Sequence, residues 1–530
     1  MNIPLTPIRC LYRGVDLYGK KVGIVSGEHL YTYAQFGERC ERLAAGLCSE
    51  GIGGGDRVAY LSFNNNQLLE GYYGVPLIRA IVMPLNVRLT PAELIQILNH
   101  SGAKALIFEG DFAPLATAFR KCCPGIQRYI AINGAAPEAD ISYEELLSRA
   151  RMDRPDPSSF DENEIAELFY TSGSTGTPKG VMLSHRTLYL HALGVLSSNP
   201  LYDTDVALHT IPLFHANGWG APQTCTMKGC RQVMVRRFEP SCVLRLIAEE
   251  KATAMQLVPV MANALLNCPD LGRFDTSSLK EIFLGGAASS PELIARMEKA
   301  FGCEVKVGYG LTETSPVVST SRLKGGLEFA SEEERVFRMS MAGWPLVGNE
   351  VRVVDSRMRD VPRDMQAVGE VIVRGDNVME GYYREPEATE HVMTDGWFHT
   401  GDMAVWDEET YIHIVDRKKD IIISGGENIS SIEVEKAVSA HPAVLECAVV
   451  SAPDAQWGEI PAAFVVLRPG QTLTCNDLLA FLEDRLAKFK MPRVIQFVGN
   501  PLPKTGTGKI LKRELREGFW QGKERRVQGG

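Results

Sequence analysis

A glycine- and hydroxyl-rich loop with one lysine is the stretch of this chain best suited to chemistry. Residues 170–180 read Y-T-S-G-S-T-G-T-P-K-G and follow an apolar strand expected over 165–170. Glycines let backbone N–H groups approach an anion, hydroxyls donate further hydrogen bonds, and Lys179 supplies a positive charge. The loop is therefore predicted to bind phosphate. It departs from the G-x-x-x-x-G-K-[ST] nucleotide signature, because Pro178 precedes the lysine and Gly180 follows it.

The same segment has a plainer interpretation as a solvated linker, since clusters of Ser, Thr and Gly usually are linkers. Apolar residues flank it on both sides, however, with Val181-Met182-Leu183 after it. Ser184 is then expected to cap a helix that begins at His185. A linker needs no such flanks, so phosphate binding is favoured. The sequence contains no G-x-G-x-x-G dinucleotide fingerprint.

Bulk composition limits the classes of protein to consider. The chain has 530 residues, 45% of them hydrophobic, which at about 150 residues per domain predicts three or four units. A formal charge of -9 argues against a general nucleic-acid binder. Twelve cysteines without a C-x-x-C pair, no signal-peptide core and no apolar run near ~20 residues predict a cytoplasmic protein without a transmembrane segment.

Strands alternate with helices before and after the loop, which predicts an α/β fold with two mostly parallel sheets covered by helices. From about 349 the pattern changes to short strands and turns, typical of a small β subdomain. A compact α+β unit follows, with strands near 446–451 and 462–467 and a helix near 476–488. The charged stretch 322–340 is expected to be an exposed loop. The expected organisation is an N-terminal domain over 1–416, a hinge at 417–419 and a C-terminal domain over 420–530.

Further motifs follow the loop in a fixed order, and together they carry a resemblance. They are G-Y-G-L-T-E-T at 308–314, T-G-D at 400–402, D-R-K-K-D at 416–420 with G-G-E-N-I at 425–429, and P-K-T-G-T-G-K at 503–509. In this order the chain resembles, over essentially its whole length, the adenylate-forming (ANL) superfamily. That superfamily includes acyl-CoA synthetases, peptide-synthetase adenylation domains and firefly luciferase. The closest likeness is to fatty-acyl-CoA synthetases.

The resemblance implies a two-step ligase reaction. A carboxylic acid attacks the α-phosphate of ATP to give acyl-adenylate and pyrophosphate, and the thiol of coenzyme A then displaces AMP. Bringing two anions together requires preorganised positive charge and backbone dipoles. The implied partners are the acid, ATP, Mg²⁺ and coenzyme A, with no nucleic acid. The oligomeric state is left open, with a homodimer as one option.

The resemblance also implies roles for individual residues. Glu313 would hold Mg²⁺ together with Thr171, Thr312 would contact the α-phosphate, and Tyr309 beside Gly310 would stack on adenine. Asp402, assisted by Arg417, would bind the ribose. Gly285, Gly286 and Ala287 would pass alongside adenine and the acyl group. The phosphate cradle would comprise Thr171, Ser172, Gly173, Ser174, Thr175, Gly176 and Lys179.

The implied C-terminal domain is mobile and serves both steps. Lys509 would supply charge to the reacting carboxylate and α-phosphate during adenylation. The domain would then rotate about Lys419, and the glycines Gly425 and Gly426 would let the thiol arm of coenzyme A pass close to the backbone.

Each of these residues has an ordinary alternative role. Asp402 follows Thr-Gly like a turn aspartate, Glu313 is placed like a capping residue, Tyr309 like a core residue and Lys509 like a solvated lysine. Their joint occurrence in a fixed order favours the functional interpretation. A catalytically inactive nucleotide-binding or scaffold protein is the alternative from another class.

The resemblance also implies an acyl pocket, in which His215, a candidate catalytic residue, would lie next to the carboxylate and Trp219 would gate the acyl tunnel. A buried packing role for Trp219 stays open. The pocket candidates, which are largely apolar, are His215, Trp219, Val258, Pro259 and Gly286. No aspartate lies in 212–224, where amino-acid-activating relatives keep one for the substrate ammonium. We therefore expect an aliphatic medium- to long-chain acid. An aryl or short thioether-bearing acid, transfer to a carrier protein, and luciferase-like oxidation stay open.

Overall fold

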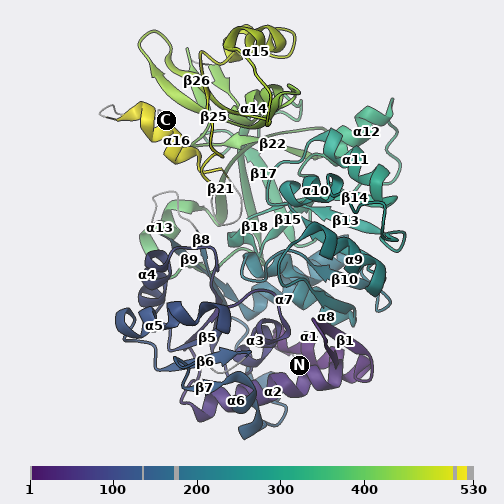
Figure 1. Ribbon diagram of the computed structural model, residues 1–530, viewed down its shortest axis with the longest axis vertical. Coiled ribbons are helices and arrows are strands. Elements are labelled where there is room, and N and C mark those ends of the chain that lie inside the picture. The colour runs from purple at the N-terminus through teal and green to yellow at the C-terminus, as the bar shows by residue number, and fades with distance from the viewer. Residues whose placement is uncertain (1–2, 134–135, 172–177, 426, 505–509, 522–530) are drawn as a thin grey trace. The chain divides into compact units, whose positions relative to one another are not determined.

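The computed structural model describes residues 3–133, 136–171, 178–425, 427–504 and 510–521 (Figure 1). The chain divides into two compact units, and each is described by itself. The first comprises Met1–Glu350 and Val373–Phe398, and the second comprises Val351–Ile372 and His399–Gly530. The domain boundaries and the hinge expected from the sequence stay a prediction.

One sheet of the first unit has the strand order β16-β15-β14-β13-β12-β10-β11-β1-β2. Its central strands pair in parallel, and β2, β15 and β16 add antiparallel edges. Parallel neighbours need crossover connections, which explains the alternation of strands and helices in the sequence. The strands are β1 (Val22–Ser26), β2 (His29–Thr32), β10 (Val206–His209), β11 (Arg231–Met234), β12 (Ala254–Leu257), β13 (Glu281–Leu284), β14 (Glu304–Gly310), β15 (Val317–Thr320) and β16 (Trp344–Pro345).

The other sheet of this unit has the order β19-β9-β8-β4-β3-β5-β6-β7. Strands β3 to β8 pair in parallel, whereas β9 is antiparallel to both β8 and β19. The expected fold class, with two mostly parallel sheets, is confirmed. The strands are β3 (Arg57–Leu61), β4 (Ile81–Pro84), β5 (Ala105–Glu109), β6 (Arg128–Ile132), β7 (Ile141–Ser142), β8 (Ile165–Thr171), β9 (Lys179–Ser184) and β19 (Gly381–Tyr382).

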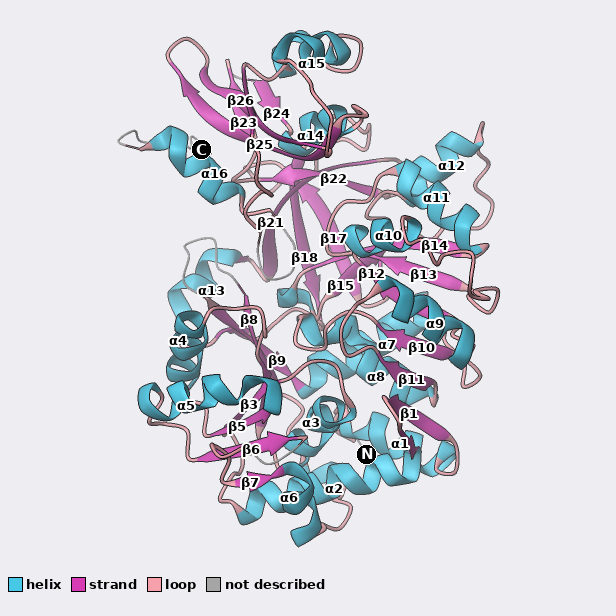
Figure 2. Cartoon of the chain, viewed as in Figure 1, coloured by secondary structure: helices cyan, strands magenta, loops and turns pink. Residues whose placement is uncertain are grey.

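Helices cover both sheets (Figure 2). Apolar residues of α9, α10 and α11 pack on the first sheet, and those of α4 and α5 pack on the second. The helices of this unit are α1 (Ile8–Tyr18), α2 (Tyr33–Ser49), α3 (Asn66–Leu77), α4 (Pro91–Ser101), α5 (Ala113–Cys122), α6 (Tyr143–Arg149), α7 (His185–Ser198), α8 (Ala221–Lys228), α9 (Pro240–Glu250), α10 (Pro259–Leu266), α11 (Pro291–Phe301), α12 (Glu332–Met339) and α13 (Pro386–Val392). In the described part of the chain, no helix has the length and apolar character needed to cross a membrane.

Local signals set several helix starts. The Thr32 hydroxyl accepts a hydrogen bond from the Gln35 N–H, and the Gln35 side chain bonds back to Thr32, which closes a capping box on α2. Ser184 caps α7 as expected, because its hydroxyl accepts the N–H of Thr187 at 3.2 Å. These caps satisfy backbone donors that the helix itself leaves unpaired.

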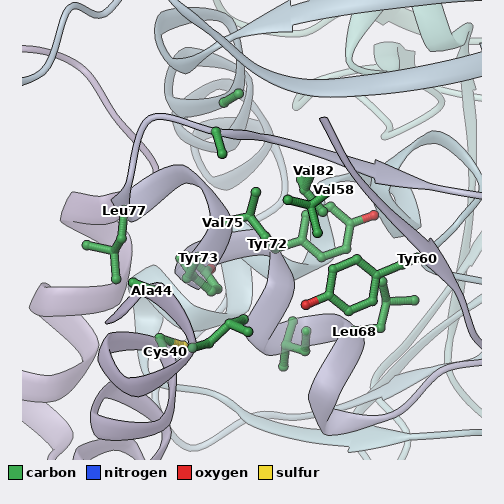
Figure 3. Close-up of a cluster of buried hydrophobic side chains, with 14 of the residues drawn as sticks. Cys40, Ala44, Val58, Tyr60, Leu68, Tyr72, Tyr73, Val75, Leu77 and Val82 are labelled. Carbon is green, nitrogen blue, oxygen red and sulfur yellow. The ribbon is translucent and has the colours of Figure 1, made fainter. Parts of the chain in front are cut away.

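A buried core joins α2 and α3 to strands of both sheets. Figure 3 shows Tyr60, Tyr72, Tyr73 and Leu68 within this cluster. Each of these side chains is at most 1% exposed. Burial of a large apolar side chain contributes about 1.5–3 kcal/mol, so this cluster stabilises the packing of the helices on the sheets.

From Glu332 on, the charged stretch 322–340 is not the exposed loop expected from the sequence, whereas residues 322–331 form no helix or strand. Helix α12 occupies Glu332–Met339, with the Ser331 hydroxyl accepting the Glu334 N–H at its start. Val336 and Met339 are buried in the core formed with α9 and α11. The prediction was wrong because high charge concealed two apolar residues at helical spacing.

The remaining sheets mix short strands, as expected beyond residue 349, with three long ones, β21, β25 and β26, of 10, 11 and 10 residues. One has the order β17-β18-β21-β20 with β22 on β21, and the other has the order β24-β23-β26-β25 with β27 on β26. The strands are β17 (Asn349–Val354), β18 (Gly369–Gly375), β20 (Met393–Thr394), β21 (Trp397–Trp406), β22 (Ile412–Arg417), β23 (Ile422–Ser424), β24 (Glu427–Ile429), β25 (Val444–Asp454), β26 (Gly458–Leu467) and β27 (Val494–Phe497).

The C-terminal helices differ in part from expectation. They are α14 (Ser431–Ser439), α15 (Cys475–Leu482) and α16 (Lys512–Trp520). The helix expected near 476–488 ends at Leu482, although Leu486 is still buried in the same core. Apolar spacing therefore continued past the end of the helix and misled the sequence-based prediction.

Candidate active site

The two ends of the predicted phosphate loop are held by a β-hairpin. Thr171 ends β8, Lys179 begins β9, and these two residues are direct partners in the antiparallel pairing. The strands thus hold the threonine and the lysine at the base of the loop. The loop residues Ser172, Gly173, Ser174, Thr175 and Gly176 lie outside the described residues.

A tyrosine that sequence analysis missed links the lysine to the predicted metal ligand. Tyr382 is buried in β19, which pairs with β9. Its hydroxyl donates a hydrogen bond to Glu313 Oε1 at 2.9 Å, and Lys179 Nζ lies 4.8 Å from the centre of its ring. The ring face attracts the ammonium group by a cation–π interaction. Lys179 and Glu313 thus share one aromatic side chain, although the sequence separates them widely.

The glutamate does not serve as the cap of its own turn. Glu313 lies in the 3₁₀ turn Thr312–Thr314 after β14. The backbone N–H of Leu311 is instead bound by the Thr314 hydroxyl, at 3.1 Å. The Glu313 carboxylate points to Tyr382, so the capping alternative does not describe its contact.

The donor set at this position suits Mg²⁺. A carboxylate and a threonine hydroxyl are hard oxygen ligands, and Mg²⁺ usually binds through one or two carboxylates plus substrate phosphates and water. Within the ranges the structure describes, no group of three or more His, Cys, Asp or Glu could hold a metal. Glu313 and Thr171 carry the kinds of oxygen donor that such an ion would need.

The carboxyl ends of β13 and β14 bring the next predicted residues to one sheet edge. These strands are parallel neighbours. Gly285, Gly286 and Ala287 follow β13, and half-buried Tyr309 and exposed Gly310 end β14. A Cβ at Gly310 would lie 1.8 Å from the Pro316 carbonyl oxygen, so only glycine fits there.

Two predicted acyl-pocket residues, Trp219 and Val258, converge on the glycine pair. A Cβ at Gly286 would lie 3.2 Å from Val258 and 3.4 Å from the Trp219 ring, and a Cβ at Gly285 would lie 3.0 Å from that ring. Trp219 also meets Phe283 edge to face, with ring centres 6.2 Å apart. Pro259 begins α10 directly after Val258, and His215 lies half-buried just before Trp219's turn. The wall they form is largely apolar.

Trp219 lies in an unusual left-handed turn (Ala216–Gly220). All five residues have positive φ, including Ala216 at 43°, Asn217 at 44° and Trp219 at 59°. Left-handed backbone costs about 1–2 kcal/mol for each non-glycine residue. Such a conformation persists only where the surroundings hold it.

A buried glutamate supplies that support. Asn217 Nδ2 donates to Glu167 Oε2 at 3.3 Å, and Gln223 Nε2 donates to Glu167 Oε1 at 2.8 Å. Asn217 Oδ1 in turn accepts the Gly220 N–H at 2.6 Å. Glu167 is 1% exposed, and burial raises the pKa of its carboxyl to about 8. The sequence indicated only an apolar strand here, so Glu167 and its partners were missed.

In the second unit, the predicted ribose-binding pair comes together. Asp402 in β21 and Arg417 at the end of β22 are direct partners in an antiparallel pairing. Arg417 Nε lies 2.5 Å from Asp402 Oδ1, and the aspartate is 3% exposed. Asp402 therefore lies inside a strand rather than in a turn, which removes the turn-aspartate alternative.

The predicted hinge residue Lys419 and the glycine Gly425 come shortly after Arg417 in the sequence. Lys419 lies in the turn between β22 and β23. The Gly425 N–H donates to the Trp457 carbonyl at 2.8 Å, and a Cβ at Gly425, where φ is 60°, would lie 2.7 Å from the Trp457 ring. Lys504 and Ile510 form a β-bridge, whereas Lys509 and Gly426 lie outside the described residues.

The chain is similar to known proteins over most of its length. Residues 12–383 match the AMP-binding enzyme family, and residues 433–509 match the AMP-binding enzyme C-terminal domain. A long-chain-fatty-acid–CoA ligase of Thermus thermophilus is 40% identical over 518 residues, 96% of this chain and 94% of the relative. A feruloyl-CoA synthase of an Amycolatopsis species is 38% identical over 489 residues, 92% and 94% of the two chains. A crystal structure of an anthranilate CoA ligase with anthranoyl-AMP has a TM-score of 0.86 at 26% identity and covers 98% of each chain.

Proposed function

Because this chain belongs to the AMP-binding enzyme family and is an AMP-forming acid–CoA ligase, we propose that its acid substrate is an aliphatic, medium- to long-chain fatty acid. The observation that carries the proposal is the apolar wall where Trp219 and Val258 meet Gly286. An apolar pocket favours an alkyl chain, since each buried methylene contributes about 0.8 kcal/mol.

In the proposed adenylation step, the two substrates are held by groups of opposite charge. Lys179 and the 171–176 loop bind the β- and γ-phosphates, and Thr312 contacts the α-phosphate. Asp402 with Arg417 binds the ribose hydroxyls, and Tyr309 stacks on adenine. Glu313 and Thr171 would hold Mg²⁺, which supplies positive charge to phosphate oxygens. Lys509 adds charge where the carboxylate oxygen forms its bond to the α-phosphorus, while the bond from that phosphorus to the β-phosphate oxygen breaks and pyrophosphate leaves.

In the proposed second step, the C-terminal domain turns about Lys419 and removes Lys509 from the acyl-adenylate. The thiol of coenzyme A loses its proton and attacks the acyl carbonyl, and the bond to AMP breaks. Gly425 and Gly426 would lie beside the thiol arm, as the resemblance implies.

A second candidate substrate is an aromatic acid. The edge-to-face pair of Trp219 and Phe283 offers ring contacts, which contribute about 0.5–1.5 kcal/mol beyond area burial. The feruloyl and anthranilate ligases among the relatives support the same candidate.

A panel of acids assayed for AMP release with coenzyme A tests the proposal. We expect kcat/KM to rise with alkyl chain length and to exceed that for ferulate and anthranilate. In Trp219→Ala the preferred chain length should shift, with kcat/KM ratios between acids changing roughly tenfold. Preference for aryl acids would select the second candidate, and AMP release without thioester would indicate a different acceptor such as a carrier protein.

A further inference from the structure

Glu167 differs from the other buried glutamates of the first unit in what it contacts. Glu70 pairs with Arg39, and Glu109 pairs with Arg236. Glu167 is equally buried but faces two side-chain amides, those of Asn217 and Gln223. A buried carboxyl group without a cationic partner is costly. Its retention in the middle of an apolar strand calls for a reason other than core packing.

The two amides that Glu167 binds belong to the segment that presents Trp219. Asn217 lies inside the left-handed turn, and Gln223 lies in the first turn of α8, directly after it. Within the part of the chain that the structure describes, Gln223 Oε1 has no hydrogen-bond partner. The hydrogen bond to Glu167 is therefore the contact that anchors this amide.

The left-handed turn determines where the Trp219 ring lies. Reversal of φ at Trp219 to the usual negative range would redirect its side chain away from Gly285 and Gly286. Asn217 holds the turn from two sides, because its amide nitrogen donates to Glu167 and its oxygen accepts the Gly220 N–H. Loss of Glu167 would release the turn at its centre.

We propose that Glu167 is a positioning residue for acyl selectivity, which clamps the left-handed turn through Asn217 and Gln223 and so seats Trp219 against the Gly285–Gly286 wall of the acyl pocket. This inference rests on the proposed function, in which Trp219 lines that pocket. Glu167 touches no reacting atom and acts through the position of the tryptophan ring. Thr171, a predicted phosphate-loop residue, ends the same strand β8. A change in the KM for the acid would therefore report an effect on the turn that Glu167 holds, and a change in the KM for ATP would report an effect at Thr171.

The test compares substitutions of Glu167 across the acid panel. Glu167→Leu removes both hydrogen bonds while filling the space, and we expect ratios of kcat/KM between long and short acids to change about tenfold. The KM for the acid should rise while the KM for ATP stays the same. In Glu167→Gln the new amide oxygen can accept from Asn217 Nδ2, and Gln223 can turn its unpartnered Oε1 towards the new NH2, so this variant should retain the wild-type ratios. Asn217→Gly, which tolerates positive φ, should fold and shift the ratios as Glu167→Leu does.

Glu70→Gln is the matched control, since it alters a buried glutamate that pairs with Arg39 instead. It should lower the melting temperature without changing the ratios. The inference is overturned if Glu167→Leu and Asn217→Gly lower kcat/KM equally for all acids, or if Glu70→Gln shifts the ratios as much. The wild-type profile separately tests the proposed function: if aryl acids are preferred, the same variants are compared on aryl acids of different size.

Discussion

At the scale of single residues, Tyr382 is the least expected member of the candidate site. Its hydroxyl binds Glu313 and its ring faces Lys179, so one side chain positions an anion and a cation that would act on the same nucleotide. Glu313 and Lys179 are each held by a contact with Tyr382 and need no direct contact with each other. The tyrosine thus contacts both charged groups at once.

Tyr382→Phe should weaken binding of the Mg²⁺–ATP complex. The change removes the hydrogen bond to Glu313 and keeps the ring below Lys179. A hydrogen bond to a charged group contributes about 1.5–3 kcal/mol, so we expect the Kd for ATP with magnesium to rise about tenfold or more. Calorimetric titration with ATP, with and without magnesium, measures the change.

The control for this variant is Tyr129→Phe, which removes another buried hydroxyl. Tyr129 lies in β6, far from Tyr382 in the sequence. It should leave ATP binding unchanged. Equal affinities for wild type and Tyr382→Phe in the presence of magnesium would contradict the positioning role.

The sequence predicted the charged site residues better than the residues that support them. Asp402 and Arg417 stand in recognisable motifs, and the structure pairs them directly. Tyr382 and Glu167 had no such signal, because each acquires its role from a contact with a remote segment. A glutamate inside an apolar strand is visible in the sequence, but its amide partners lie some fifty positions away.

At the scale of elements, the strands and helices of the first unit follow the sequence pattern closely. Parallel strands are buried on both faces and read as short apolar runs, such as 105–109 and 165–171, which makes them recognisable. Helices α12 and α16 were not anticipated, since their charged residues outnumber the few apolar ones that pack. Helix α16 is held by contacts that a sequence pattern does not reveal, with Arg516 donating to the Lys419 carbonyl at 3.0 Å and to Asp420 at 2.8 Å.

The turn between β22 and β23 carries the prediction made at this scale. Lys419→Pro fixes φ near −65° and also restricts the residue before it. The variant should keep ATP–pyrophosphate exchange and lose formation of the CoA thioester, because rotation of the turn is blocked while the adenylation arrangement is retained. Separate assays of the two half-reactions measure this.

Lys419→Ala removes the same side chain without restricting the backbone, and both of its half-reactions should stay close to wild type. Normal thioester formation by Lys419→Pro would remove the hinge assignment. Loss of both half-reactions in both variants would instead indicate a role for the lysine side chain.

At the scale of the whole molecule, one chain has to catalyse two reactions of the same acid, the first at the α-phosphorus of ATP and the second at the acyl carbonyl carbon. The first unit carries the loop lysine, the predicted metal ligand and the acyl wall, and the second carries the Asp402–Arg417 pair and the terminal P-K-T-G-T-G-K segment. We assign Lys509, the final lysine of that segment, to adenylation alone. It follows that the two half-reactions can be separated by one substitution.

The most direct test is to measure both half-reactions of Lys509→Ala. We predict that ATP–pyrophosphate exchange with the acid falls about a hundredfold or more, whereas conversion of supplied acyl-adenylate and coenzyme A to thioester proceeds as in wild type. Lys488→Ala, which changes an exposed lysine of the second unit outside that segment, should change neither reaction. Equal losses in both half-reactions of Lys509→Ala, or no loss in exchange, would contradict the account.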